Sequence, residues 1–112
     1  MRGATPLQVL RRWRQYVRIV HRAVRSAVPE AEVYVAGGAA EGRLTVMSDV
    51  DVLVVLPRAL TRDEAVEVRA RVMERAEELG LPLYAPVELH VISGEELEEY
   101  ARRGRVVPAD RV

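Results

Sequence analysis

The chain contains no cysteine among its 112 residues, which excludes disulfides and zinc sites built on thiolates. No run of 18 apolar residues occurs, so a membrane-spanning helix is not expected. The opening "MRGATPLQVLRRWRQ" lacks the apolar core and small-residue cleavage site of a secretory signal. These absences predict a cytoplasmic protein without a membrane partner.

Lysine, asparagine and phenylalanine are also missing, and all 17 basic residues are arginines. Scarce amide residues suit a thermophile, although a codon bias toward arginine would give the same composition. The formal net charge is zero, yet residues 1–28 carry seven arginines and no acid, and residues 88–99 carry five glutamates and no arginine. The overall charge therefore indicates no class of partner, whereas the two ends differ in what they attract.

Apolar spacing and turn signals predict one domain over residues 1–112, with the element order α-β-β-α-β-α. We expect helices over 5–28, 61–80 and 93–103, and strands over 32–38, 50–57 and 86–93. Residues 39–48 are expected to form a loop, with a helical turn as an alternative for part of it, and the tail a short edge strand. Thr61 with Glu64, and Ser93 with Glu96, predict capping boxes at two helix starts. The fold class is therefore α/β (α+β), a small mixed sheet of three to four strands with helices packed on it.

The nearly continuous apolar run of the middle strand predicts burial on both faces. Because side chains alternate along a strand, Val52, Val54 and Leu56 are expected to form core. Val87, Leu89 and Val91 are expected to pack with them. One stripe of the first predicted helix carries five arginines, namely Arg11, Arg14, Arg18, Arg22 and Arg25. This stripe is either a solvated face or a surface for a phosphate or protein partner.

Two aspartates open this buried strand, where an unpaired charge is unfavourable. Asp49 and Asp51 are two residues apart, so both side chains are expected on one face. Carboxylates placed in this way bind a hard divalent cation, or a pair of ions about 3.5–4 Å apart. Glu88 is the acidic residue that lies within a predicted strand in the second half of the chain, and it would complete the site. His90 lies on the same face of that strand and is expected to be a neighbour without a role. The plainer alternative is a solvated strand end.

Gly37 and Gly38 end the preceding strand, where glycine lets backbone N–H groups approach a phosphate closely. Such a pair is usually only a turn, and an Asp-x-Asp alone is usually a surface feature. Together, ten residues apart, they predict a nucleoside triphosphate site beside a metal site. Arg43 in the intervening loop is a further candidate for contact with the triphosphate.

This combination resembles the minimal nucleotidyltransferase family of the DNA polymerase beta-like nucleotidyltransferase superfamily. Its members have a Gly-Gly or Gly-Ser pair after a strand, an Asp-x-Asp opening the next strand, and a third carboxylate on a later strand. Residues 37–38, 49–51 and Glu88 match this pattern, and the resemblance is best over residues 33–92. Gly38 stands where the minimal family usually has serine, and Ala39 where it often has arginine. Glu88 replaces a commoner aspartate.

The resemblance implies transfer of a nucleoside monophosphate from a nucleoside triphosphate such as ATP to an acceptor hydroxyl. It implies two Mg²⁺ ions, with Mn²⁺ as a substitute, held by Asp49 and Asp51, while Glu88 binds one ion and helps to deprotonate the acceptor. Gly37 and Gly38 would cradle the triphosphate. Minimal members are often paired with HEPN-domain proteins in toxin–antitoxin modules, so the implied partner is a HEPN-type protein or a second copy of the chain.

Two other functions remain open. The same fold could serve as a non-catalytic antitoxin or assembly subunit, which the missing serine and arginine favour and the three carboxylates oppose. A nucleic-acid binder would use the arginines of the first helix. Only Trp13 and Tyr16 interleave with those arginines, which is little support for base stacking, so nucleic acid is the least favoured partner.

Overall fold

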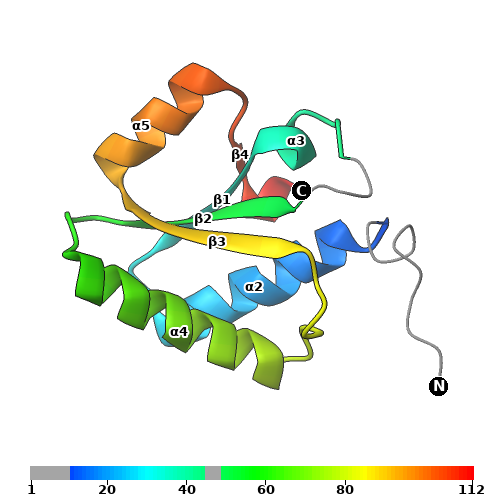
Figure 1. Cartoon of the computed structure of the whole chain (residues 1–112), viewed down its shortest axis with the longest axis horizontal. Helices are drawn as coiled ribbons and strands as arrows, with labels where there is room; N and C mark the ends of the chain where they lie inside the picture. The colour runs from blue at the N-terminus through cyan, green and yellow to red at the C-terminus, as the bar shows by residue number, and fades with distance from the viewer. Residues whose placement is uncertain (1–10, 45–48) are drawn as a thin grey trace.

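The computed structural model describes residues 11–44 and 49–112. The described elements are α2 (Trp13–Ala27), β1 (Glu32–Ala36), α3 (Gly37–Ala40), β2 (Val50–Leu56), α4 (Arg62–Glu78), β3 (Val87–Ser93), α5 (Gly94–Arg103), β4 (Val107–Pro108) and a 3₁₀ turn (Ala109–Arg111). They form a four-stranded mixed sheet with helices on both faces (Figure 1). The predicted α/β (α+β) class and the predicted edge strand are therefore confirmed.

The strand order is β3-β2-β1-β4, in which β2 and β3 are parallel and β1 is antiparallel to both of its neighbours. β2 is a central strand, and apart from its second residue all of its side chains are buried. The parallel pair is connected through α4, as a parallel connection requires a crossover. In Figure 1, α2 and α4 cover one face of the sheet and α5 covers the other.

The alternation along β2 divides the core into two layers. Val52, Val54 and Leu56 are buried in the layer beneath α2 and α4, where Leu89 is also buried and Val87 and Val91 are partly buried. Leu53 and Val55 are buried in the smaller layer beneath α5. The side chains predicted to form core on β2 and β3 therefore do lie on one face of the sheet. By alternation, Asp51 and Glu88 lie on the opposite face, which α5 covers.

Both predicted capping boxes are present. Glu64 N donates to Thr61 Oγ1 at 3.2 Å, and Thr61 N donates to Glu64 Oε1 at 3.0 Å, which lowers the pKa of Glu64. Glu96 N likewise donates to Ser93 Oγ at 3.4 Å. Because Ser93 is the last residue of β3, this second box fixes the start of α5 at the end of that strand. Among the helices described, none is both long and apolar enough to cross a membrane.

Two predicted boundaries need comment. In the described residues α2 begins at Trp13, with Arg12 as an N-cap whose side chain makes no capping hydrogen bond. The start predicted at Thr5–Pro6 lies outside the described residues. The strand predicted over 32–38 ends at Ala36, because Gly37 turns the chain with φ +67° and begins α3. The loop predicted over 39–48 therefore begins within α3, whose last two residues supply the helical turn considered there, and residues 45–48 lie outside the described part.

Truncating Val54 to alanine is expected to lower the free energy of unfolding by about 1–3 kcal/mol, because a cavity remains in a fully buried site. Val66→Ala is a matched control, since Val66 is 61% exposed and its loss should change stability by less than about 0.5 kcal/mol. Urea denaturation of both variants measures the difference. Equal effects would contradict the assigned face of β2.

Candidate active site

Three side chains suited to metal binding meet where β2 and β3 begin. Asp51 lies opposite Glu88 in the parallel register, and His90 is two residues further along β3 on the same face. His90 Nε2 is 3.0 Å from Asp51 Oδ1 and 3.9 Å from Glu88 Oε1. One donor atom from each of the three residues lies within 4.8 Å of the others. We call Asp51, Glu88 and His90 the carboxylate–histidine cluster.

The cluster is open to solvent and fits a divalent cation. The side chains of Asp51, Glu88 and His90 are 33%, 48% and 27% exposed, so water or a substrate can reach them. Two close carboxylates repel one another unless a cation or proton lies between them. Carboxylate oxygens are the donors that Mg²⁺ and Mn²⁺ accept, with the remaining positions filled by water or phosphate.

Gly37 contacts the cluster from the side of β1. Ala36 is paired with Asp51 across β1 and β2, so the next residue lies beside the aspartate. A Cβ atom added to Gly37 would lie only 2.6 Å from Asp51 Oδ2, and its φ of +67° is in the left-handed region. Glycine is therefore required at this position for both the backbone turn and the close approach. Gly38 follows in α3, where its carbonyl accepts a hydrogen bond from Arg43 N at 2.7 Å.

Two predicted site residues lie apart from this cluster. Asp49 is exposed just before β2 and is not one of its three members. Arg43 is 68% exposed and pairs with Glu41 at 3.1 Å. Ser48, which precedes the first aspartate, lies outside the described residues. The roles predicted for Asp49 and Arg43 thus remain predictions, whereas Asp51 and Glu88 are brought together as expected.

A small hollow on the Gly37 side of Asp51 contains two cationic residues that sequence reasoning missed. It has a volume of about 140 Å³, and its lining includes Gly37 and Asp51 together with Arg103 and Arg105, which close α5 and follow it. Both arginines are exposed and lie more than 50 positions after Asp51 in the chain. No local motif marks them, because only the packing of α5 over the sheet brings them to the site.

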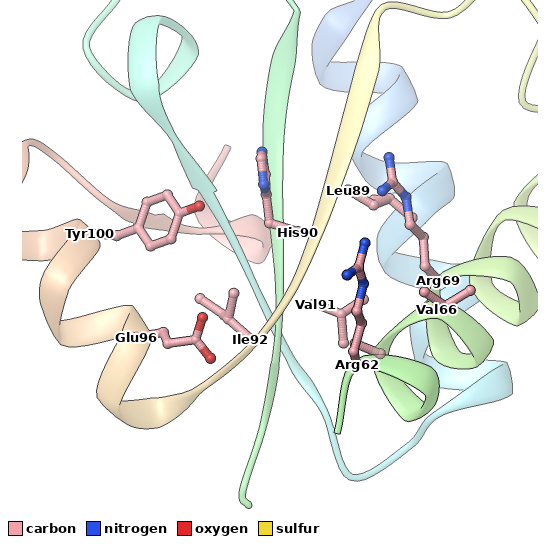
Figure 2. A pocket seen from close by; sticks show the side chains of 10 residues that line it. Arg62, Val66, Arg69, Leu89, His90, Val91, Ile92, Glu96 and Tyr100 are labelled. Carbon is pink, nitrogen blue, oxygen red and sulfur yellow. The ribbon is translucent and has the colours of Figure 1, made fainter. Parts of the chain in front are cut away.

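A second hollow, of about 320 Å³, lies along β3 and shares His90 with the cluster. Figure 2 shows Arg62 and Arg69 reaching up from α4 on one side, and Glu96 and Tyr100 from α5 on the other. Burial, followed by the charge of Asp51, raises the pKa of Tyr100, so this phenol stays neutral at physiological pH. β3 is an edge strand of the described sheet, so this second hollow opens away from the glycines.

Comparison with known proteins identifies the family. The family model of the nucleotidyltransferase domain matches residues 17–106. A crystal structure of a protein regarded as a nucleotidyltransferase aligns with a TM-score of 0.63 and 20% identity, over 83% of this chain and 96% of that one. Another such protein, from Sulfolobus solfataricus, aligns with a TM-score of 0.56 and 22% identity, over 88% and 83% of the two chains.

A toxin–antitoxin structure with AMP-PNP aligns with a TM-score of 0.54 and 15% identity, over 83% of this chain and 71% of that one. At these identities the three structures show a shared fold. A search of curated protein sequences gives no significant match. The family model, by contrast, matches most of the chain and includes the glycine pair, the Asp-x-Asp and the third carboxylate. The chain therefore belongs to the nucleotidyltransferase domain family.

Proposed function

We propose that this protein is a magnesium-dependent nucleotidyltransferase that transfers a nucleoside monophosphate from ATP to a hydroxyl of a partner protein. The observation that best supports this proposal is the convergence of Asp51 and Glu88 beside Gly37, in a chain of this family. Asp51 and Glu88 would hold one ion, and Asp49 would join Asp51 in holding a second. When bound, such ions neutralise charge on the transferring phosphoryl group.

The triphosphate would bind on the glycine side of Asp51. Gly37 and Gly38 would present backbone N–H groups to it, as the family resemblance implies. Arg103 and Arg105 line the same hollow as Gly37 and Asp51, and they supply positive charge that Ala39 cannot. Arg43, the cation predicted from sequence, is the alternative to Arg103 and Arg105 for contact with the triphosphate.

Arg103→Gln is expected to weaken ATP binding by about tenfold, the size of a lost charge-assisted hydrogen bond. Arg102→Gln is the matched control, because Arg102 is exposed on α5 and does not line the hollow. Arg43→Gln measured beside them tests the cation predicted from sequence. Calorimetric titration with a non-hydrolysable ATP analogue and Mg²⁺ gives all three affinities, and an equal loss for Arg102→Gln and Arg103→Gln would contradict the assignment.

The acceptor would approach from the opposite side, through the hollow along β3. His90 lines that hollow and lies 3.9 Å from Glu88 Oε1, and Glu88 would accept the proton of an incoming hydroxyl. The similar toxin–antitoxin structure with AMP-PNP supports a nucleotide and a protein partner for this fold. We propose a HEPN-type protein as that partner, or a second copy of this chain.

Incubation with labelled ATP, Mg²⁺ and the protein encoded by the neighbouring gene tests the proposal. Label should pass to that protein, and no transfer should occur when EDTA removes the metal. Tight complex formation without transfer from any of the four common triphosphates would reject the enzyme and favour a binding-only antitoxin. The missing hydroxyl at Gly38 and the missing cation at Ala39 favour that second function.

A further inference from the structure

The imidazole of His90 lies within the carboxylate–histidine cluster, and the proposed reaction assigns it no role. Its Nε2 is 3.0 Å from Asp51 Oδ1 and 3.9 Å from Glu88 Oε1. Alternation along β3 puts Glu88 and His90 on one face of the strand. A nitrogen donor therefore points to the same place as the two carboxylates.

We propose that His90 Nε2 is itself a ligand of the divalent ion at Asp51 and Glu88, and that the site consequently prefers Mn²⁺ to Mg²⁺. This inference rests on the metal site of the proposed function and adds a nitrogen ligand and a metal preference to it. Imidazole suits transition metals, whereas Mg²⁺ takes oxygen donors almost exclusively. Mn²⁺ accepts both donor types, so a set of two oxygens and one nitrogen selects it over Mg²⁺.

The geometry of the cluster suits such coordination. Two adjacent ligands of an octahedral ion with bonds of about 2.1 Å lie about 3 Å apart. The separation of His90 Nε2 from Asp51 Oδ1 is 3.0 Å, so these two atoms need no movement to share an ion. Glu88 must approach further, and its side chain is 48% exposed, so solvent borders it on the side where a change of rotamer would occur.

Tyr100 supports the imidazole from α5. The ring centroids of His90 and Tyr100 are 6.0 Å apart, with an angle of 54° between the ring planes. Aromatic pairs at this distance attract one another weakly, which favours this orientation of the imidazole together with its 3.0 Å contact to Asp51. A ligand atom that is already oriented lowers the ordering cost of binding.

A second role for His90 must be separated from this one. The same 3.0 Å contact would let Nε2–H donate a hydrogen bond to Asp51 and only position the carboxylate. A positioning residue would affect Mg²⁺ and Mn²⁺ binding alike, and it would leave no nitrogen bound to the ion. Direct coordination predicts a metal-selective effect and a bound nitrogen.

Pulsed electron paramagnetic resonance of the full chain with Mn²⁺ alone distinguishes the two roles. We expect coupling of a directly bound ¹⁴N in the wild type and none in His90→Asn. His21→Asn is the matched control, because His21 is the other histidine of the chain and lies on α2. This variant should keep the coupling, and a thermal melt of each variant verifies that it folds.

Affinity measurements complete the test. His90→Asn should weaken Mn²⁺ binding at least about tenfold, the size expected for a lost metal-site contact, and change Mg²⁺ binding less than about twofold. Bound Mn²⁺ without nitrogen coupling in the wild type would overturn this inference and leave the carboxylate site intact. Failure of the wild type to bind either ion, even with a triphosphate present, would instead reject the metal site of the proposed function.

Discussion

Replacing Asp51 with asparagine is expected to reduce nucleotidyl transfer at least about a hundredfold. A metal ligand contributes several kcal/mol of charge stabilisation in the transition state, and each 1.4 kcal/mol corresponds to about a tenfold change in rate. Asp51 is central to the proposed site, since it contacts His90, is paired with Glu88 on the neighbouring strand and lies against Gly37. Initial rates of label transfer from ATP measure the effect.

Asp51→Asn should also separate metal binding from folding. Without metal the variant should be as stable as the wild type or more stable, because one of two neighbouring like charges is removed. Mg²⁺ with a triphosphate should raise the melting temperature of the wild type by ligand linkage, and this rise should disappear in the variant. Asp110→Asn is the control carboxylate, since Asp110 is exposed in the final 3₁₀ turn.

An equal metal response in Asp51→Asn and the wild type would contradict the proposed site. Asp49→Asn, made in parallel, tests whether the exposed aspartate before β2 shares the same ion. If it does, its loss should also stop transfer. A variant that transfers label normally would remove Asp49 from the proposed site and leave Asp51 and Glu88.

Gly37→Ala should inactivate the protein by a steric route. A non-glycine residue in the left-handed region costs about 1–2 kcal/mol, and the φ of Gly37 is +67°. The added Cβ would in addition lie 2.6 Å from Asp51 Oδ2, so the carboxylate must move away from Glu88 and His90. We therefore expect a lower melting temperature together with a loss of transfer approaching that of Asp51→Asn.

Gly38→Ala is the matched control for Gly37→Ala. Gly38 is not among the positive-φ glycines, and a Cβ there would meet Arg43 O at 3.5 Å, an ordinary contact. Stability should therefore change little, and Gly38→Ser, which adds the hydroxyl usual in the minimal family, should keep or raise the transfer rate. An equal fall in melting temperature for both alanine variants would contradict the steric role assigned to Gly37.

The parts of the fold that sequence predicts well are those with local causes. The capping boxes at Thr61 and Ser93 involve residues three apart, and both helices begin where these residues indicate. The buried strand follows from its own apolar run, since β2 lies between two other strands. The glycine pair and the Asp-x-Asp likewise lie close in the chain, so their spacing already indicates the kind of site.

The remaining features depend on distant parts of the chain. The contact of His90 with Asp51 requires the parallel register of β3 on β2, which no residue near either one specifies. Arg103 and Arg105 reach the glycine side only because α5 packs on the sheet. The start of the helical turn at Gly37 also lacks a local signal, since glycine favours no single conformation and its φ here is +67°.

The crossover through α4 has a consequence for the order of folding. Asp51 and Glu88 belong to parallel neighbours, so they meet only after a long loop has closed and α4 has docked. Contacts between distant segments form late, because chain entropy must be lost before they are made. During refolding from urea, the circular dichroism of the helices should therefore recover before the chain can bind Mn²⁺. A nascent chain ending after α4 would carry Gly37 and Asp51 without Glu88 or His90, so the proposed site would be complete only once β3 has joined the sheet.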